Sequence, residues 1–475
     1  MISPSLHPET VAADCESRRH WSFALTGRSM ALLIVGFGWV IPGFWDSRLS
    51  YGMLAWDALV LLAALLDGLR LPSASDLKAS RSWANAPALD SETEIELTLN
   101  NGGRVIIECK LEDDLAPALA SEPVLQRVTA FPRVPAKIRY RIEPQERGDS
   151  EARCLYVRYR SPLGLAERWA RAPLQQSVRV YPALRAGEEQ QIFLARSRQI
   201  DLQLRQARQR GLGRDFESLR EYREGDDLRD ICWTATARRG TPITRQYQTE
   251  RSQAVWIVLD CGRLMRSRVA AVTPGRAAMP SGAPPVRVHS KLDFACTTAV
   301  SLAQLALFSG DRVGLLAYGQ GMQQRILPGR GGAHMRQLIE ALAQVRAESS
   351  EADHLRATAT LNRLQPRRSL ILWITDLAES AMRPEVIDGA VQLLRRHVLL
   401  FVAMAQPEVE MIADARPKNV EQMFRAAAAQ EMAGRREILL ARLHEQGTLT
   451  LNLNPESLTS TVLNQYLTVK ERAMV

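Results

Sequence analysis

Histidine and cysteine, the residues that most often bind metals or act as nucleophiles, are scarce in this sequence. Its 475 residues include 7 histidines and 6 cysteines. The cysteines lie far apart, with no Cys-x-x-Cys pair and no pair of histidines nearby, so the sequence offers neither a recognisable zinc site nor a disulfide framework. We therefore interpret the cysteines as reduced thiols of a cytosolic protein.

Familiar catalytic motifs are also missing. The sequence has no HExxH, and no histidine lies at a recognisable spacing from a serine or cysteine nucleophile. The stretch "PGRGGAH" (328–334) resembles a phosphate-binding loop, but it lacks the Lys-Ser/Thr ending of a nucleotide site and is equally typical of a turn. We expect no catalytic residues and no bound cofactor.

What the sequence does contain is an excess of basic residues in a composition typical of globular proteins. Lysine and arginine number 61 against 52 acidic residues, which gives a net charge of +9 and a pI of about 9.5. Such a charge is compatible with nucleic acid or an anionic membrane surface as a partner. With 46% hydrophobic residues, the chain is long enough for two or three cores.

Two apolar runs near the N-terminus, Ser29–Trp45 and Met53–Leu71, each approach the length of a membrane span. They predict a transmembrane helical hairpin over residues 29–71, preceded by a tail over residues 1–28. Tryptophans and tyrosines cluster around the turn of this hairpin, where an aromatic belt would lie. A cleaved signal peptide and a buried hairpin of the core are the alternatives.

Basic residues flank both ends of this hairpin. Three arginines precede it and two arginines and a lysine follow it, whereas the turn holds only Arg48. Cytoplasmic loops of membrane proteins carry an excess of Lys and Arg. We therefore expect a two-pass protein of the bacterial cytoplasmic (inner) membrane, with both termini and all soluble domains in the cytoplasm.

Residues 82–182 are dominated by short segments of alternating apolar and polar residues, which predict about six or seven strands of a small β-sandwich. Residues 183–252 comprise a basic connector and then a charged segment, "GRDFESLREYREGDDLRDICWTATARRG". Its apolar stripe predicts a capped helix from about Asp227 to Arg239. Its carboxylates nearly balance its arginines, which disfavours nucleic-acid binding and leaves a docking surface or a solvated, salt-bridged helix.

Strands and helices alternate over residues 253–475, where "AVWIVLD" ends in Asp260 and "SLILWITD" ends in Asp376. Near-continuous apolar strands need cover on both faces, so we expect an α/β fold with a doubly wound, mainly parallel sheet. Because ligands bind at the carboxyl ends of such strands, the two acids are expected together at one edge. A flexible loop is predicted beside them over Ser267–Ser290.

The segment "GRDFESLREYREGDDLRDICWTATARRGTPITRQYQTE" (213–250), followed by a strand and an Asp, resembles the signature of domain-of-unknown-function family fifty-eight. Two further stretches are similar to that family, "SPLGLAERW" (161–169) and "LNQYLTVKERA" (463–473). The resemblance implies a von Willebrand factor A-like domain behind a membrane hairpin and a β-rich module. It also implies partnership with a MoxR-type AAA+ ATPase in assembling or maturing protein complexes or envelope components.

The resemblance further implies a place for Mg²⁺. Von Willebrand factor A-like domains bind this ion through an Asp-x-Ser-x-Ser motif, a Thr on another loop and a second Asp, since hydroxyls and carboxylates suit it. Here Asp260 and Asp376 are the two acids, but Gly262 and Leu264 replace the serines. We expect a degenerate metal-ion-dependent adhesion site, in which Arg263 supplies the positive charge in place of the ion.

These patterns predict a membrane-anchored, cytosol-facing adaptor for other proteins, not an enzyme. Its expected partners are the ATPase, a client protein and the membrane. The residues expected to form its binding surface are Arg214, Arg220, Tyr222, Arg223, Asp226, Trp233, Asp260, Gly262, Arg263 and Asp376. Two alternatives stay open: a metal-dependent hydrolase that uses Asp260, Asp376 and a carboxylate of segment 214–230, and a nucleic-acid-binding module formed by the basic connector.

Overall fold

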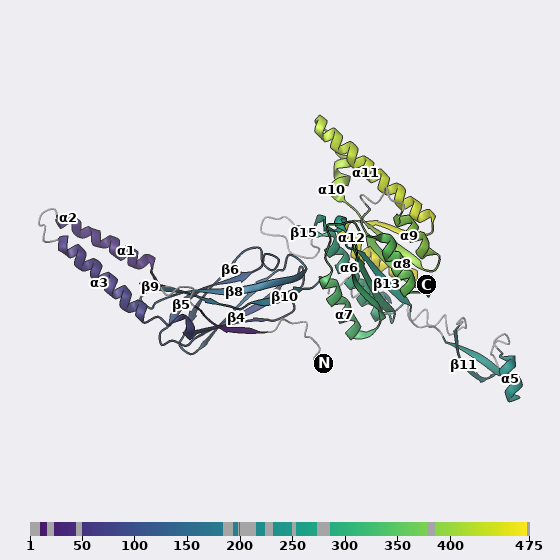
Figure 1. Cartoon of the computed structure of the whole chain (residues 1–475), viewed down its shortest axis with the longest axis horizontal. Coiled ribbons are helices and arrows are strands. Elements are labelled where there is room, and N and C mark those ends of the chain that lie inside the picture. Colours follow the sequence, from purple (N-terminus) through teal and green to yellow (C-terminus); the bar gives the residue numbers. More distant parts are fainter. Residues whose placement is uncertain are drawn as a thin grey trace. The chain divides into compact units, whose positions relative to one another are not determined.

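The chain forms two compact units, Met1–Ala183 and Leu184–Val475, whose helices and strands are labelled in Figure 1. The computed structural model describes residues 10–16, 23–43, 50–183, 193–197, 199, 215–223, 231–248, 253–272, 286–377 and 385–472. Most of the basic connector, together with Arg214 and Asp226, lies outside the described residues.

The first unit contains two antiparallel sheets that share one core. One sheet has the order β1-β3-β4-β7 and the other β2-β9-β8-β5-β6, with β10 beside β8. The strands are β1 (Val11–Asp14), β2 (Phe23–Leu25), β3 (Leu77–Trp83), β4 (Thr93–Asn101), β5 (Ile107–Leu115), β6 (Val124–Ala130), β7 (Pro135–Ile142), β8 (Gly148–Arg160), β9 (Ala166–Ala172) and β10 (Gln176–Val180). Buried and accessible residues alternate along β3 and β4, as the period of two predicts.

The N-terminal segment is part of this module. β1 pairs with β3 and β2 pairs with β9, each at the edge of its sheet, and β3 begins already at Leu77. The structure therefore differs from the predicted boundaries, which made residues 1–28 a separate tail and began the module at residue 82. Strands of three or four residues carry almost no periodic signal, which is why the sequence pattern missed β1 and β2.

Between β2 and β3 the chain forms α1 (Gly27–Gly36), η1 (Phe37–Trp39), α2 (Val40–Gly43), α3 (Ser50–Leu69) and η3 (Ala74–Asp76). Helices α1 and α3 lie side by side (Figure 1), and the Trp56 indole N–H donates to the carbonyl oxygen of Leu32 at 2.9 Å. Large apolar side chains of both helices are exposed, among them Ile34 at 68% and Leu69 at 67%. By length and composition, α3 and α6 (Lys291–Phe308) are the described helices that could cross a membrane, but the apolar window of α6 is 72% buried against 22% for that of α3.

Both ends of the α1–α3 segment are tied to one turn, Ser161–Leu165, between β8 and β9. Thr26, which caps α1, donates its hydroxyl to the carbonyl oxygen of Gly164 at 2.5 Å. Asp67, near the end of α3, is 2% exposed and accepts from the Ser161 hydroxyl and, at 3.2 Å, from the N–H of Leu165. The two helices therefore leave the module from the same place.

The second unit is built on a six-stranded sheet of order β17-β16-β13-β18-β19-β20, parallel except for β17 at one edge. Its strands are β13 (Ala254–Asp260), β16 (Arg312–Tyr318), β17 (Met322–Gly329), β18 (Leu370–Thr375), β19 (Val398–Met404) and β20 (Leu449–Leu453). Strands β13, β18 and β19 are buried along their whole length, as strands covered on both faces must be. The expected α/β fold with a mainly parallel sheet is present.

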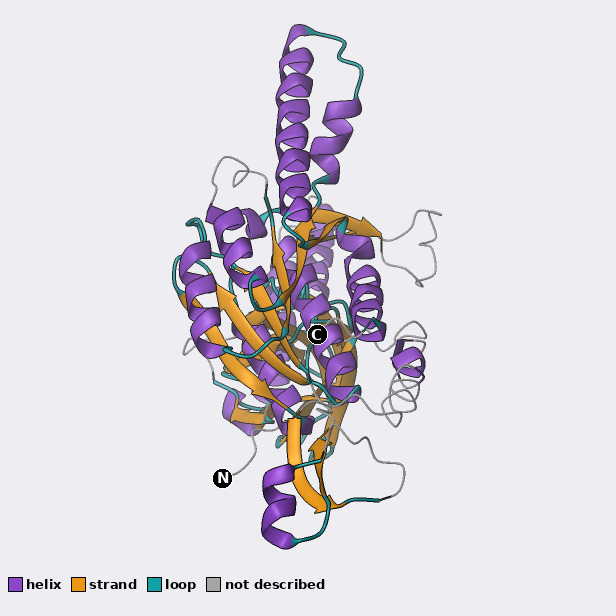
Figure 2. Ribbon diagram, turned by 90° about the vertical axis from the view of Figure 1, so that its right-hand side faces the viewer, coloured by secondary structure: helices purple, strands orange, loops and turns teal. Residues whose placement is uncertain are grey.

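Helices cover both faces of this sheet (Figure 2). One core includes α6, α7 (Gly331–Gln344) and α12 (Pro455–Glu471), and the other includes α8 (His354–Leu364), α9 (Glu385–Leu394) and the C-terminal part of α11 (Val420–Glu445). Helix α10 (Pro407–Asp414) packs along α11, and this α10–α11 pair extends beyond the sheet (Figures 1 and 2).

Three short pieces complete the second unit: η5 (Arg263–Arg266), an antiparallel ribbon and the charged segment of the family signature. The ribbon of β14 (Arg268–Val272) and β15 (Val286–Ser290) occupies both ends of the predicted flexible loop, so that prediction is wrong for those residues. In the signature, β11 (Asp215–Glu221) pairs with β12 (Ile243–Gln248) and α5 covers Trp233–Arg239. The predicted helix from Asp227 to Arg239 is thus present from Trp233, and it is wrong for Ile231, which forms a β-bridge with Thr244, and for Cys232, which precedes the helix. Residues 227–230 lie outside the described part of the chain.

Candidate functional site

Asp260, the last residue of β13, holds its carboxylate inside the protein and is only 4% exposed. The N–H of Gly262 donates to one carboxylate oxygen at 2.7 Å, and the hydroxyl of Thr375 donates to the other at 2.6 Å. Burial raises the pKa of Asp260, and the charge of Asp376 adds to this effect, against the lowering by His354 and the two hydrogen bonds. The two acids predicted to meet at the sheet edge therefore lie near each other, linked through Thr375.

Asp376 is fully buried and is surrounded by donors from three elements. Lys291, the first residue of α6, forms a buried ion pair with it. Gln406, between β19 and α10, donates to the same oxygen at 3.0 Å, and Arg436 of α11 reaches the other oxygen at 3.4 Å. Burial lowers the pKa of Lys291 and of Arg436, and Asp376 opposes the change in both. One carboxylate thus fastens α6, α10 and α11 to the sheet edge.

The loop after α7 closes over the end of β13. The N–H of Glu348 donates to the carbonyl oxygen of Cys261 at 2.7 Å, and the carbonyl oxygen of Ser350 accepts from the N–H of Arg263 at 2.8 Å. The carboxylate of Glu348 accepts from the N–H of Gln320 at 2.8 Å, and this bond holds the pKa of Glu348 below its ordinary value. Backbone bonds therefore fix the loop against the strand end.

A buried polar network of Tyr318, His354 and Trp373 lies near Asp260. The Trp373 indole N–H donates to the Tyr318 oxygen at 2.7 Å, and that oxygen lies 2.9 Å from Nδ1 of His354. Burial lowers the pKa of His354, although the charge of Asp260 opposes the effect. The histidine is 7% exposed, so it is placed as a packed core residue and offers no accessible general base.

The residues at this edge do not fit the Mg²⁺ site that the resemblance implies. A Cβ atom at Gly262, where the motif has its first serine, would come within 2.9 Å of the backbone nitrogen of Ala352 and 3.1 Å of Asp260. Both oxygens of Asp260 already accept hydrogen bonds, and Asp376 faces two cations. Among the described residues, no group of three or more His, Cys, Asp and Glu side chains is arranged to hold an ion.

The charge beside Asp376 comes from residues that the sequence pattern did not single out. Arg263, the expected substitute for the ion, begins η5 and is exposed. Lys291 and Arg436 form buried ion pairs with the acid. A signal for Arg436 existed, because it lies three and seven residues before Leu439 and Leu443 on the buried stripe of α11.

The remaining predicted residues lie on the signature segment. Arg220 belongs to β11, and Tyr222 and Arg223 follow it, with the N–H of Tyr222 donating to the carbonyl oxygen of Pro242 at 2.9 Å. Trp233, the first residue of α5, is 70% exposed. An indole this exposed on an ordered helix is a candidate contact for another protein.

Five exposed apolar side chains lie near the end of α10 and at the start of α11, and we refer to them as the apolar tip. They are Met411, Ile412, Val420, Met423 and Phe424, and their exposed fractions run from 43% for Ile412 to 67% for Phe424. A groove of about 270 Å³ along the α10–α11 pair is lined by Gln406 and Arg436, two of the residues that contact Asp376. The buried acid is therefore connected to the helices that carry the tip.

Residues 218–421 match the family described as "Protein of unknown function DUF58", which confirms the resemblance for that part of the chain. Uncharacterized proteins of Mycobacterium bovis and Mycobacterium tuberculosis are 26% identical over 206 residues, which make up 42% of this chain. The aligned region covers 58% of those relatives, less than two thirds of their length.

A solved structure, the conserved hypothetical protein BatB from Bacteroides thetaiotaomicron, aligns over its whole length with 46% of this chain. The sequence identity is 14% and the TM-score is 0.29. A likeness this weak defines no fold.

Proposed function

We propose that this protein is a membrane-anchored adaptor that docks another protein on its second unit, and that the partner is a MoxR-type AAA+ ATPase. The observation that carries the proposal is the link from the buried Asp376 to an exposed apolar tip. The acids at the strand ends are occupied within the protein, while the α10–α11 pair that Asp376 helps to fasten presents an accessible apolar surface.

The membrane anchor in this proposal is the α1–α3 segment, acting as a transmembrane hairpin. Its apolar side chains are exposed on both helices, which is costly in water and favourable in a bilayer. Both helix ends are tied to the Ser161–Leu165 turn, so a hairpin of this kind must begin and end on the same side of the membrane. Together with the flanking arginines and lysines, this supports a cytoplasmic location for both units.

The second unit acts in this proposal as a von Willebrand factor A-like domain without its ion. A mainly parallel sheet covered on both faces, with acids at the ends of the adjacent strands β13 and β18, supports that assignment. The chain's own Lys291 and Arg436 provide the positive charge beside Asp376. The structure of this sheet edge is thereby fixed permanently, whereas with a metal ion in their place it would depend on whether the ion is bound.

A partner would contact the apolar tip, because Asp260 and Asp376 are too deeply buried to be reached. Exposed apolar clusters of this kind mark interaction sites, and methionines adapt their shape to a partner. Few residues at an interface carry most of its binding energy, and large buried side chains dominate among them. Phe424, with two thirds of its surface exposed, is the strongest candidate for such a residue.

The alternatives gain no support from the described residues. A hydrolase would need an accessible base or an ion at the Asp260–Asp376 edge, where the donors described above already occupy the carboxylates. Nucleic-acid binding was expected from the basic connector, most of which lies outside the described residues.

The test is capture of the ATPase from detergent-solubilised membranes under nucleotide-trapping conditions. We expect the full-length chain to retain the ATPase. The Met423→Asp/Phe424→Asp variant should capture at least about tenfold less of it, because hot-spot residues contribute about 2 kcal/mol or more to binding. Leu125→Asp, which changes an equally exposed leucine of the first unit, is the matched control and should capture as well as the parent. Equal capture by the tip variant and the parent would refute the proposal, as would absence of the ATPase from both.

A further inference from the structure

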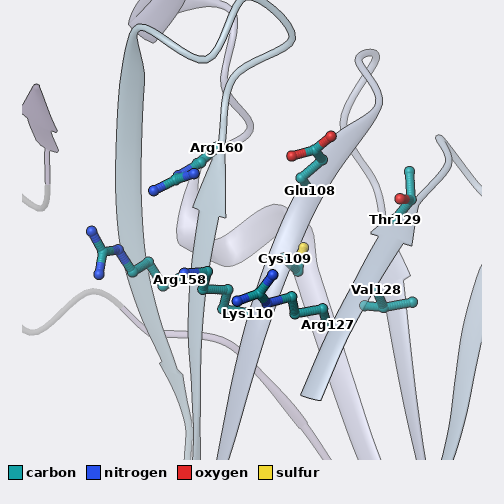
Figure 3. A pocket seen from close by; sticks show the side chains of 8 residues that line it. All are labelled: Glu108, Cys109, Lys110, Arg127, Val128, Thr129, Arg158 and Arg160. Atoms are coloured by element: carbon teal, nitrogen blue, oxygen red, sulfur yellow. The ribbon is translucent and has the colours of Figure 1, made fainter. Parts of the chain in front are cut away.

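The outer face of the six-stranded sheet of the first unit carries a row of cations across three neighbouring strands. Arg127 of β6 is directly opposite Lys110 of β5, and Lys110 is directly opposite Arg158 of β8. Together with Glu108 and Arg160 they line a groove of about 480 Å³ (Figure 3). Like charges placed directly opposite each other destabilise a sheet, so this row needs an explanation beyond folding.

Carboxylates of the protein only partly neutralise this face. Arg158 and Arg160 share Glu167, which is 3% exposed beneath them, and Arg158 also lies over the ring of Trp169 at 5.8 Å. Within the described part of the chain, Lys110 and Arg127 have no acidic partner. The Nε atom of Arg158 is buried and has no acceptor. An anion in the groove would meet the Lys110 ammonium and the Arg127 guanidinium, which have no acidic partner among the described residues of the groove.

The row lies close to the place where α1 and α3 leave the module. Arg160 is the last residue of β8, and the Ser161–Leu165 turn that follows it holds Thr26 and Asp67. Arg158, which belongs to the row of cations, lies two residues before Arg160 on the same strand, at a distance of about 7 Å. Such a distance is within the roughly 8 Å over which charges act at physiological salt.

We propose that this groove binds the phosphate headgroup of an anionic phospholipid in the membrane surface from which the hairpin emerges. The inference rests on the proposed membrane anchoring of α1 and α3. Guanidinium groups bind phosphate oxygens in pairs, and a lysine adds a point charge. A headgroup bound here would hold the module against the bilayer and fix the direction in which the second unit is presented.

The experiment uses the full-length chain, extracted from bilayers of phosphatidylglycerol and phosphatidylcholine in equal amounts, with retained lipids counted by native mass spectrometry. We expect phosphatidylglycerol to be enriched over phosphatidylcholine. Lys110→Gln/Arg127→Gln should reduce this enrichment by about fivefold for each cation removed, since each basic residue near such a surface contributes about 1 kcal/mol. The matched control is Lys137→Gln/Arg139→Gln, which removes two cations from β7 in the other sheet and should leave the enrichment unchanged.

A second arm of the experiment distinguishes a bound lipid headgroup from a bound soluble anion. It measures the rate at which the Lys110 side chain is acylated when the protein is in nanodiscs. We expect slower acylation in phosphatidylglycerol nanodiscs than in phosphatidylcholine nanodiscs, and no slowing by millimolar inorganic phosphate in the latter. Equal protection by inorganic phosphate would overturn the lipid assignment, and so would equal enrichment in the Lys110/Arg127 variant and the parent. If the parent does not enter bilayers at all, the proposed membrane anchoring fails instead, and the two failures are distinguishable.

Discussion

Asp376 and Lys291, two of the buried charges at the sheet edge, differ in how much their removal should destabilise the protein. Asp376→Leu leaves Lys291 and Arg436 buried without their carboxylate, at a cost of about 3–5 kcal/mol. Lys291→Met leaves Asp376 with Arg436 and Gln406, so we expect a smaller loss of about 1–2 kcal/mol. Urea unfolding of the full chain, followed by hydrogen exchange of β13 and β18 amides, measures both.

The double variant Lys291→Met/Asp376→Leu provides the control for this asymmetry. Because it removes the most buried cation together with the acid, it should be more stable than Asp376→Leu alone. Equal losses in the two single variants would show that Asp376 is not the centre of the cluster.

A second residue-scale prediction concerns pH and Glu348. Its pKa is held below the ordinary value of 4.5, so its contribution to stability is present above that pH and is lost as the pH falls through the lower value of the folded state. Glu348→Gln should therefore weaken protection of the loop after α7 by about 1 kcal/mol at neutral pH, and the difference from the parent should disappear in acid.

Hydrogen exchange of the loop amides across the acid range measures this difference. Glu351→Gln, which changes an exposed neighbouring acid, is the comparison and should show a smaller change at neutral pH. A Glu348→Gln difference that persists unchanged in acid would mean that the charge of Glu348 does not stabilise the loop.

At this scale, the sequence could place the acids but not their partners. Asp260 and Asp376 each follow a continuous apolar run, and the rule that parallel strands end at one edge brings them together. Lys291 and Arg436 are 85 and 60 residues from Asp376 in the chain, and only the packing of α6 and α11 brings them to it. Arg263 was expected to supply the charge because it is close to Asp260 in sequence, and its side chain is exposed, whereas the buried ion pairs of Asp376 are formed by Lys291 and Arg436.

Among the elements, α11 gives a prediction that depends on backbone alone. Its 26 residues include Gly434, where an added Cβ would meet nothing within 4 Å, so Gly434→Ala should stabilise the helix by up to about 1 kcal/mol. Gly447, just beyond the helix, has φ of 92°, and the same substitution there should destabilise by about 1–2 kcal/mol. Thermal unfolding and hydrogen exchange of α11 should show opposite signs. The same sign in both variants would contradict this account of the helix end.

Elements with a long, regular pattern were predictable, and short or tertiary ones were not. The alternation of strands and helices predicted over residues 253–475 is present, and the long helices α6 and α12 belong to it. The edge strands β1 and β2 have four and three residues and are stable only against β3 and β9. Sequence reasoning also missed α10, because eight residues packed along α11 carry little periodicity of their own.

At the scale of the whole molecule, the β-module and the helical segment constrain each other. The chain enters α1 from β2 and returns from α3 to β3, and both strands belong to the same module. A hairpin that crosses a bilayer must then have both of its ends, and the β-module they belong to, on one side. The sequence predicted this from the distribution of Arg and Lys, and the strand pairing supports it independently.

This arrangement predicts which positions a membrane-impermeant thiol reagent can reach in intact cells. The native cysteines are all buried, so single introduced cysteines report without background. Tyr51→Cys, at the exposed start of α3 far from the module, should be labelled from outside, whereas Ser121→Cys, on the surface of the module, should be labelled only after permeabilisation. Ser75→Cys, just after α3, is the sharpest control, because it shares the helix end with Asp67 and should behave like Ser121→Cys. Labelling of all three in intact cells would place the module outside the cytoplasm, and labelling of none would mean that the hairpin does not cross the bilayer.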